Sequence, residues 1–562
     1  MSNFEFSAIC HDGLSDSATL RVPKRRIAEI FFLLLYVVIC VILSAFHEPW
    51  FDEAQAWMIA RSASLKEILF TIPHYEGHPP LWHLILMPFA RLGCPYELTL
   101  GAISITFSTI SASLILFKSN LPRFLRRVLP FTYFFLYQYG VISRPYSLLA
   151  LAFILAAIAW RRRNEHPGRF AASLGLICLS SSYGIVLSAG IALVWLYEIW
   201  HRQHIGRFFR TFIHDRRFFC LLALLILGVV LILTVRPAPD ANGVNMEDIS
   251  QGFFARLFFM LLIAPTDALF LSNMSYGALV WQTFSVSTIL VAGCAGIFLM
   301  SILFWIGEKA KTTALLFIPY ILYAVFAAKV YFWLHHIGIF TIFLVFWLWI
   351  TFEQPDTDVS LSPRTAFAQF LVYALTMFSC AMSVFWTICA GAADIQGNYG
   401  HGRTIAEFID QYHLTDYPML VSWEHEVDEN TGEEWYNLSN CPLAYSILPY
   451  YNENLFINVS DGSHNYFYSS NRAPDYQTNE RIADYVLTQP IPRVLIGDCF
   501  LDDIYQNQEC ADINYIPVYV VEDNYIWKNV QYENHYYIFM DDTLAKELGL
   551  SAIQVPEWTE AN

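Results

Sequence analysis

Two adjacent carboxylates, Asp52 and Glu53, follow the first apolar segment of the chain. A carboxylate is costly to remove from water, so at a membrane surface it marks either the solvent-facing start of a helix or a site that handles protons. Neighbouring residues on a helix point about 100° apart, so these two acids would not share a proton. One could face a cavity as a general base while the other braces the loop. The alternative is that Asp52 caps a helix beginning at Glu53.

A second polar group follows about twenty residues later, around the Pro-Pro pair at 79–80. Its side chains are of types that bind divalent cations, but their spacing matches no compact zinc pattern. Histidines beside prolines also orient loops through hydrogen bonds. We therefore expect no metal here and assign to four of these residues the alignment of a substrate hydroxyl: Tyr75, Glu76, His78 and His83. His74 belongs to the same group.

Cationic side chains stand at the ends of two later apolar segments. Arg144 precedes Pro145 and Tyr146, and a guanidinium fork suits phosphate oxygens. Tyr146 is assigned to substrate alignment, like the four residues of the first loop. The alternative for Arg144 is an interfacial arginine that extends its charge into water. The second group is the segment 329–336. Its aromatic residues are common at any membrane interface, so the informative residues are Lys329, His335 and His336.

The composition determines which elements must position these residues. Apolar residues make up 56% of the 562 residues, and they come in runs of membrane-spanning length, which predicts a polytopic helical membrane protein. Residues 392–562 hold 28 of the 49 acidic residues but only 6 of the 33 basic ones. The acidic charge of this tail argues against nucleic acid and anionic lipid surfaces as its partners.

Basic clusters flanking apolar runs favour the cytoplasm, and this rule predicts eleven spans with residues 1–26 inside and the tail outside. The first outer loop, 47–96, then carries Asp52 and Glu53, with 54–93 as juxtamembrane helices. The segment 253–272 is interrupted by Pro265 and Asp267 and should be surface-lying or re-entrant. The predicted spans are 27–46, 97–117, 127–142, 144–160, 170–182, 184–200, 218–235, 277–305, 313–329, 337–352 and 366–391. The pair 170–182 and 184–200 could instead form one tilted helix with an extension.

The tail, 392–562, is expected to be a folded extracytoplasmic α/β domain. Strand-like runs occur at 418–423, 455–459, 493–497, 515–521 and 536–540, and helical patterns at 402–412 and 478–487. A disulfide between Cys499 and Cys510 is an open possibility, because a third tail cysteine, Cys441, leaves the pairing undetermined.

The order of these motifs resembles the GT-C superfamily of membrane glycosyltransferases. The carrying features are Phe51-Asp52-Glu53 in the first outer loop, Gly77-His78-Pro79-Pro80-Leu81 after it, and Arg144-Pro145-Tyr146 at the outer end of a later span. The pattern is similar to protein O-mannosyltransferases and to bacterial aminoarabinose and lipopolysaccharide-core transferases that use polyprenyl-phosphate sugars. The resemblance covers about residues 27–391 in organisation and leaves the tail unexplained. The chain lacks a β-trefoil-like repeat, which puts a protein acceptor in doubt.

This resemblance implies an inverting transfer of a sugar from a polyprenyl-phosphate donor to a glycan, lipid or protein hydroxyl on the extracytoplasmic side, as in cell-envelope glycan biosynthesis. It places Asp52 as catalytic base, Glu53 as supporting acid and Arg144 as donor-phosphate ligand. Lys329, His335 and His336 are assigned to the phosphate by position only. No cofactor is expected, with Mg²⁺ or Mn²⁺ as the alternative.

Two other function classes fit a polytopic chain. A transporter or flippase for polyprenyl-linked sugars would more often show inverted repeats and charges in mid-membrane, and this sequence shows no repeat and few such charges. A membrane-anchored binding protein that works through its acidic tail would leave most of the spans without a role.

Overall fold

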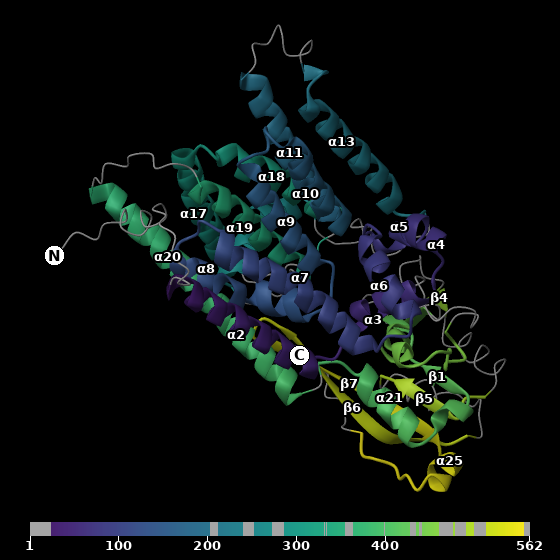
Figure 1. The fold of residues 1–562 in the computed structure, drawn as a ribbon. Coiled ribbons are helices and arrows are strands. Elements are labelled where there is room, and N and C mark those ends of the chain that lie inside the picture. The colour runs from purple at the N-terminus through teal and green to yellow at the C-terminus, as the bar shows by residue number, and fades with distance from the viewer. Residues whose placement is uncertain are drawn as a thin grey trace. The chain divides into compact units, whose positions relative to one another are not determined.

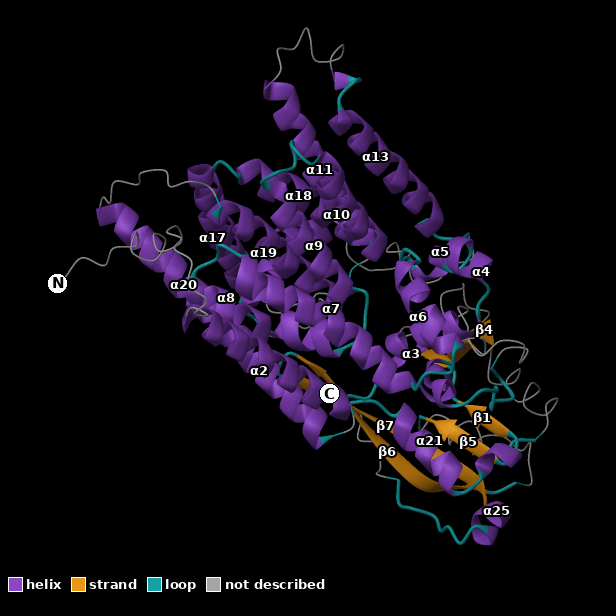
Figure 2. Cartoon of the chain, in the orientation of Figure 1, coloured by secondary structure: helices purple, strands orange, loops and turns teal. Residues whose placement is uncertain are grey.

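The computed structural model of this chain is mostly helical, with strands confined to the C-terminal region (Figures 1 and 2). It describes residues 24–202, 212–239, 252–271, 286–330, 332, 334–353, 363–397, 399–427, 434–437, 441–459, 476–477, 491–498 and 513–555. The chain divides into two compact units. The first comprises 1–43, 102–233 and 245–390, and the second comprises 44–101, 234–244 and 391–562.

The first unit is a helical bundle. Its described helices are α2 (Lys24–Phe46), α7 (Tyr96–Lys118), α8 (Arg123–Val128), α9 (Tyr146–Trp160), α10 (Pro167–Ser180), α11 (Ser182–Arg202), α13 (Arg216–Val235), α14 (Phe253–Phe258), α15 (Ala264–Leu269), α17 (Val286–Ala310), α18 (Thr313–Lys329), α19 (Gly338–Phe352) and α20 (Pro363–Gln396). Short turns η1 (Leu129–Phe131) and η5 (Leu334–Ile337) and two π-helical segments, η2 (Phe134–Val141) and η3 (Phe259–Ile263), join them. One end of each of α2, α7, α13 and α20 extends beyond this unit's boundaries.

Seven of the described helices are long and apolar enough to cross a membrane, where the sequence predicted eleven spans. They are Arg26–Phe46, Tyr96–Lys118, Ser182–His201, Arg216–Val235, Val286–Ala310, His335–Phe352 and Phe370–Gln396. The length and composition of these helices agree with the expected helical membrane protein. Two further predicted spans are the apolar helices α9 and α18, which are shorter, at 15 and 17 residues.

One predicted span, 127–142, is interrupted, because it is divided among α8, η1 and the π-helical η2. The segment 253–272, which the sequence left out of the spans, is divided among α14, the π-helical η3 and α15. The run 170–200 forms two helices rather than one, because Ser181 between α10 and α11 is extended, with φ −164° and ψ 149°. A predicted span at 277–305 is helical from Val286, and 277–285 lie outside the described residues.

The second unit joins the first loop to the tail. The loop contributes α3 (Phe51–Ser62), α4 (Leu65–Phe70), α5 (Pro73–Glu76) and α6 (Leu81–Arg91), so this loop is helical, as expected. The tail contributes α21 (Gly402–Gln411), α22 (Pro442–Ile447), α25 (Asp542–Glu547) and strands β1 (Met419–Val421), β2 (Glu424–Val427), β3 (Glu434–Asn437), β4 (Tyr476–Gln477), β5 (Val494–Gly497), β6 (Tyr515–Trp527) and β7 (Val530–Asp541). The sequence had grouped the loop with the membrane domain instead.

The main sheet of the second unit has four strands in the order β1-β5-β7-β6. β1 and β5 are parallel, whereas β7 is antiparallel to both β5 and β6. β6 and β7 form a long hairpin whose turn residue Lys528 has a positive φ of 58°. A separate antiparallel sheet has the order β2-β3-β4. The mixed strands and flanking helices confirm an α/β tail, with strands at or near the predicted runs in 418–423, 493–497, 515–521 and 536–540 and a helix at 402–411.

One apolar core holds the second unit together. Residues of the loop helices, such as Ile59 and Ile68, share it with β5 residues such as Leu495. The guanidinium of Arg61 on α3 donates to the carbonyl oxygens of Leu448, Pro449 and Tyr451, at 3.3, 3.4 and 2.7 Å. Contacts across nearly 400 residues therefore fix α3, the helix that carries Asp52 and Glu53. The predicted strand at 455–459 is represented by a bridge at Phe456, whereas the helix at 478–487 and the Cys499–Cys510 bridge lie outside the described residues.

Candidate functional site

The start of α3 is held by a buried histidine between two carboxylates. His47 directly follows α2, and its Nε2 lies 3.0 Å from Oε2 of Glu53 in the first turn of α3. Its Nδ1 lies 3.4 Å from Oδ2 of Asp394, near the end of α20. The exposed fractions are 5% for His47, 0% for Glu53 and 2% for Asp394. We call these three residues the His47 triad.

Glu53 also caps the helix within this arrangement. The backbone N–H of Trp50 donates to Oε2 of Glu53 at 3.2 Å, so the carboxylate satisfies one of the free donors at the helix start. A negative charge there also matches the positive end of the helix dipole. Glu53 is thus the brace of the loop.

Asp52 occupies a different environment from its neighbour. α3 begins at Phe51 with Trp50 as its N-cap, so the N-cap interpretation of Asp52 is wrong by two positions. The helix starts earlier because Glu53 reaches back to Trp50. Asp52 is only partly buried in the first turn, whereas Glu53 is enclosed. Of the two acids, only Asp52 is partly exposed.

A second, partly buried network includes Glu48, the residue that follows His47. The Arg403 backbone N–H donates to Oε1 of Glu48, and its guanidinium donates to both oxygens of Glu97 at 2.8 Å. A forked pair of this kind fixes geometry as well as charge. The hydroxyl of Tyr450 also donates to Glu97. A Cβ on Gly400 would stand 3.1 Å from Cγ of Glu48, so glycine permits this close approach.

Burial and ion pairing shift the pKa values of several ionisable groups in the second unit. Burial alone would lower the pKa of His47, but the charges of Glu53 and Asp394 overcome it and raise the pKa to about 10. The imidazole is therefore protonated at neutral pH. Burial raises the pKa of Glu48 to about 7, against the opposing effect of Arg403. Burial also raises the pKa of Asp498 to about 6.

The raised pKa of His47 predicts a stability that depends on pH. The contribution is fully present below the ordinary pKa of 6.5 and is lost as the pH rises through about 10. We expect the thermal unfolding temperature of the detergent-solubilised protein to fall over this window. In a triple variant, His47→Gln with Glu53→Gln and Asp394→Asn, the fall should be smaller because the linked proton is gone. Parallel curves for the two proteins would contradict the ion pairing.

The four predicted substrate-aligning residues of the loop lie on or beside α5 and α6. Gln55 of α3 donates to Oε1 of Glu76 at 2.9 Å, so Glu76 faces the helix that carries Asp52. His83 is buried, and Tyr75 and His78 are partly buried. Nδ1 of His74 lies 2.6 Å from the Arg236 carbonyl oxygen, a hydrogen-bonding distance. Within the described residues, no group of three or more His, Cys, Asp or Glu residues could hold a metal ion.

In the first unit, the structure brings three of the predicted site residues together. The ring centroid of Tyr146 lies 5.8 Å from that of His335 and 6.1 Å from that of His336. Tyr139 and Tyr323 donate hydroxyl hydrogen bonds to the backbone carbonyl oxygens of His335 and His336, respectively. The two histidines are therefore held by tyrosines just before α19, and all three predicted side chains are buried.

Arg144 and Lys329 are less enclosed. Arg144 precedes α9, two residues before Tyr146, and is partly buried. Lys329 is the last residue of α18 and is exposed. The π-helical segment η2 lies on the N-terminal side of Arg144, and π-helical turns occur often at functional sites. The structure thus places the two histidines, but not Lys329, in an enclosed setting beside Tyr146.

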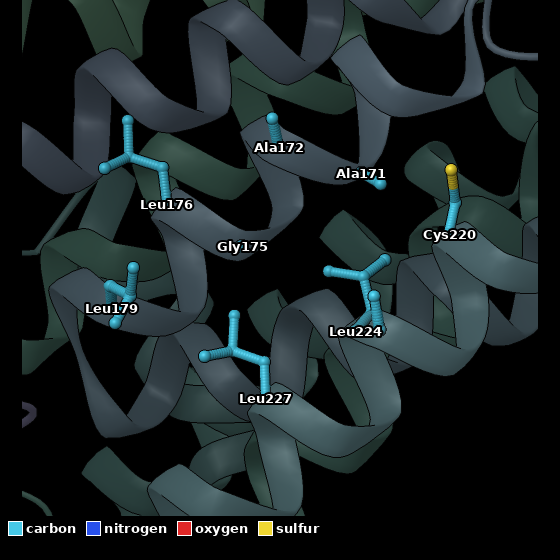
Figure 3. A pocket seen from close by; sticks show the side chains of 9 residues that line it. Ala171, Ala172, Gly175, Leu176, Leu179, Cys220, Leu224 and Leu227 are labelled. Carbon is cyan, nitrogen blue, oxygen red and sulfur yellow. The ribbon is translucent and has the colours of Figure 1, made fainter.

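A pocket between α10 and α13 is apolar and lacks the charged and polar groups of the sites described above (Figure 3). Its volume is about 390 Å³, and small and leucine side chains of α10 and α13 line it together with Cys220. It offers no carboxylate, imidazole or cation. Such a groove suits apolar chains and cannot carry out proton or phosphate chemistry.

Several residues of the candidate site were missed in the sequence. Asp394 carried a detectable signal, because it is the only acidic residue in the 34-residue α20, and ionisable residues in apolar helices are commonly functional. His47 and Arg403 gave no such signal, since Asp394, the second partner of His47, and Glu97, the partner of Arg403, are remote in sequence. Lys528 is fully buried at a hairpin turn, where exposure is the usual state.

Comparisons of this chain with protein-family models, with curated proteins and with solved structures find no match. The functional argument therefore rests on the site itself.

Proposed function

We propose that this protein is an integral membrane glycosyltransferase that moves a sugar from a polyprenyl-phosphate donor to an acceptor hydroxyl. The observation that carries the proposal is the pair of adjacent acids in two environments. Asp52 is accessible at the start of α3, and Glu53 is enclosed and paired with His47. Carboxylates separated in this way commonly serve different roles in one reaction.

In the proposed reaction, Asp52 accepts the proton of the acceptor hydroxyl while that oxygen attacks C1 of the donor sugar. The C1–phosphate bond breaks, and the electron pair leaves with the polyprenyl phosphate. A base positioned within hydrogen-bonding reach contributes about 10²–10⁴-fold to such a step. The leaving phosphate needs positive charge, for which Arg144 is assigned, with His335 and His336 near Tyr146.

The proposed location is the cell membrane, with the N-terminus in the cytoplasm and the tail on the extracytoplasmic side. Basic clusters beside the apolar helices support this orientation, and the seven long apolar helices support insertion in a membrane. Residues 44–101 and 391–562 share one apolar core, so loop and tail would lie on the same side.

The direct test is sugar transfer from synthetic polyprenyl-phosphate sugars by the purified protein in lipid nanodiscs. Cell-envelope glycans compared by mass spectrometry with and without the protein would supply the acceptor. Appearance of free polyprenyl phosphate and a new glycoside supports the proposal. Movement of the donor across vesicle bilayers without bond cleavage would favour the flippase alternative instead.

Arg144→Ala should weaken donor binding and turnover together. A phosphate contact made in the ground state strengthens as charge develops on the leaving group. Its loss should therefore raise KM for the donor and lower kcat. Arg144→Lys should recover only part, because an ammonium lacks the planar fork. Steady-state kinetics measure donor KM and kcat. Unchanged values in Arg144→Ala would show that Arg144 is an interfacial arginine and not a phosphate ligand.

Transfer should persist in EDTA. A monophosphate leaving group that faces fixed cationic side chains does not require a divalent ion as Lewis acid. We expect EDTA-treated protein to keep most of its activity, measured with the same donor. Complete loss restored by Mg²⁺ or Mn²⁺ would contradict both the metal-free reaction and the choice of a monophosphate donor.

A further inference from the structure

The start of α3 also lies beside a row of aromatic rings that the proposed reaction leaves without a role. The ring centroid of Trp50 lies 5.8 Å from that of Tyr525 on β6, and Tyr525 lies 5.9 Å from Tyr399. Tyr399 in turn lies 4.7 Å from the imidazole of His47. All four residues belong to the second unit. The row therefore joins the tail hairpin to the loop that carries Asp52.

The two ends of this row differ in accessibility. Tyr399 and His47 are buried, with 3% and 5% exposed, whereas Trp50 and Tyr525 are only partly buried. The enclosed end is fixed by the His47 triad, whose ion pairs hold the imidazole on both sides. At the partly exposed end, the rings of Trp50 and Tyr525 are therefore adjacent to the buried Tyr399 and the His47 triad.

The hairpin that presents Tyr525 is itself anchored. Trp527 and the turn residue Lys528 are fully buried, and the Tyr525 backbone is paired with β7 in an unbroken register from Tyr519 to Trp527. A ring held in this way loses little conformational freedom when it binds a ligand. The site is preorganised.

The surroundings restrict the class of ligand. Asp52 follows Trp50 by two residues, and the His47 triad, with two carboxylates and one imidazolium, adds a net negative charge nearby, which disfavours anionic ligands. Rings of Trp and Tyr carry negative faces that attract the polarised C–H groups of a neutral ring, and their polar edges tolerate water and hydroxyls. A pyranose presents one C–H face and a rim of hydroxyls, so it satisfies both conditions.

We propose that Trp50 and Tyr525 form a stacking platform for a sugar ring of the acceptor, which presents a hydroxyl to Asp52. This inference rests on the proposed function for the role of Asp52, but binding to the platform does not require turnover. The C-terminal tail then takes part in substrate binding, because Tyr525 supplies half of the acceptor site. The acceptor would be a glycan or glycolipid.

The binding test uses octyl β-D-glucoside, octyl β-D-galactoside and octyl α-D-mannoside as probes, with 1-octanol as the matched chain without a sugar. Full-length protein in nanodiscs is titrated with each probe below its micellar concentration, and binding is followed by saturation-transfer NMR. We expect at least one glycoside to bind more tightly than octanol. Tyr525→Ala and Trp50→Ala should each weaken that binding about tenfold, the loss expected when one stacked ring is removed.

Tyr525→Phe and Trp50→Phe keep a ring and should retain most of the binding. Tyr519→Ala is the matched control, because Tyr519 stands on the same strand but stacks on Phe408, at 4.8 Å. Thermal unfolding of each variant checks the fold. Equal binding of octanol and every glycoside, or full binding by both alanine variants, would overturn the platform.

A kinetic experiment determines whether the sugar ring that stacks on Trp50 and Tyr525 belongs to the acceptor or to the donor. In transfer assays, Tyr525→Ala should raise KM for the acceptor and leave KM for the donor unchanged. A rise in donor KM alone would overturn the acceptor assignment. If glycosides bind as expected while the protein transfers no sugar, the platform stands and the proposed function fails, so the two outcomes remain distinguishable.

Discussion

Asp52→Asn should abolish sugar transfer while leaving the fold and donor binding nearly intact. The amide has almost the shape of the carboxylate but cannot accept the proton of the acceptor hydroxyl. Loss of a general base costs about 10²-fold or more in kcat. Because Asp52 is only partly buried and Glu53 provides the brace of α3, the unfolding temperature should stay close to that of the wild type.

Single-turnover transfer with a synthetic donor measures this effect, and donor binding is measured separately by equilibrium titration. Asp416→Asn provides a control, since Asp416 is exposed in the tail of the same unit. Glu53→Gln should behave differently from Asp52→Asn, with lower stability accompanying any lower activity. Turnover above roughly a tenth of wild type in Asp52→Asn would be incompatible with a general base.

His47→Leu should produce the largest loss of stability among single substitutions in the loop. It removes the positive partner of two enclosed carboxylates, Glu53 and Asp394, and leaves their charges uncompensated. Removing one partner from a buried ion pair costs about 3–5 kcal/mol. The loss should appear as a large drop in unfolding temperature at neutral pH, where the native imidazole is charged because the pKa of His47 is raised to about 10.

Neutralising the carboxylates should rescue this variant. In His47→Leu combined with Glu53→Gln and Asp394→Asn, no charge of the triad remains, so part of the lost stability should return. His214→Leu is the control, because His214 is an exposed histidine of the first unit. A His47→Leu protein as stable as His214→Leu would show that the triad contributes nothing to holding the start of α3.

Local patterns in the sequence determined the elements. Apolar runs predicted most of the long helices, and alternating apolar residues predicted strands such as β1, β5, β6 and β7, because hydrophobic periodicity depends only on nearby residues. For the same local reason, the apolar pattern did not show that among the described residues α9 and α18 are short or that 127–142 is divided. Apolar composition does not show where the backbone turns π-helical, as in η2 and η3, or ends early, as in α10.

Only part of the candidate site could be predicted from the sequence. The acid pair at 52–53 could be found, since its position after an apolar segment is a local feature. The different environments of the two acids depend on Asp394 and on His47 being brought together across more than 300 residues. The partnership of Arg403 with Glu97, and of Tyr525 with Trp50, depends on the packing of the tail against the loop helices within one core. Pairing at long range is decided by tertiary structure, because no periodicity of either segment encodes which distant charge or ring it will meet.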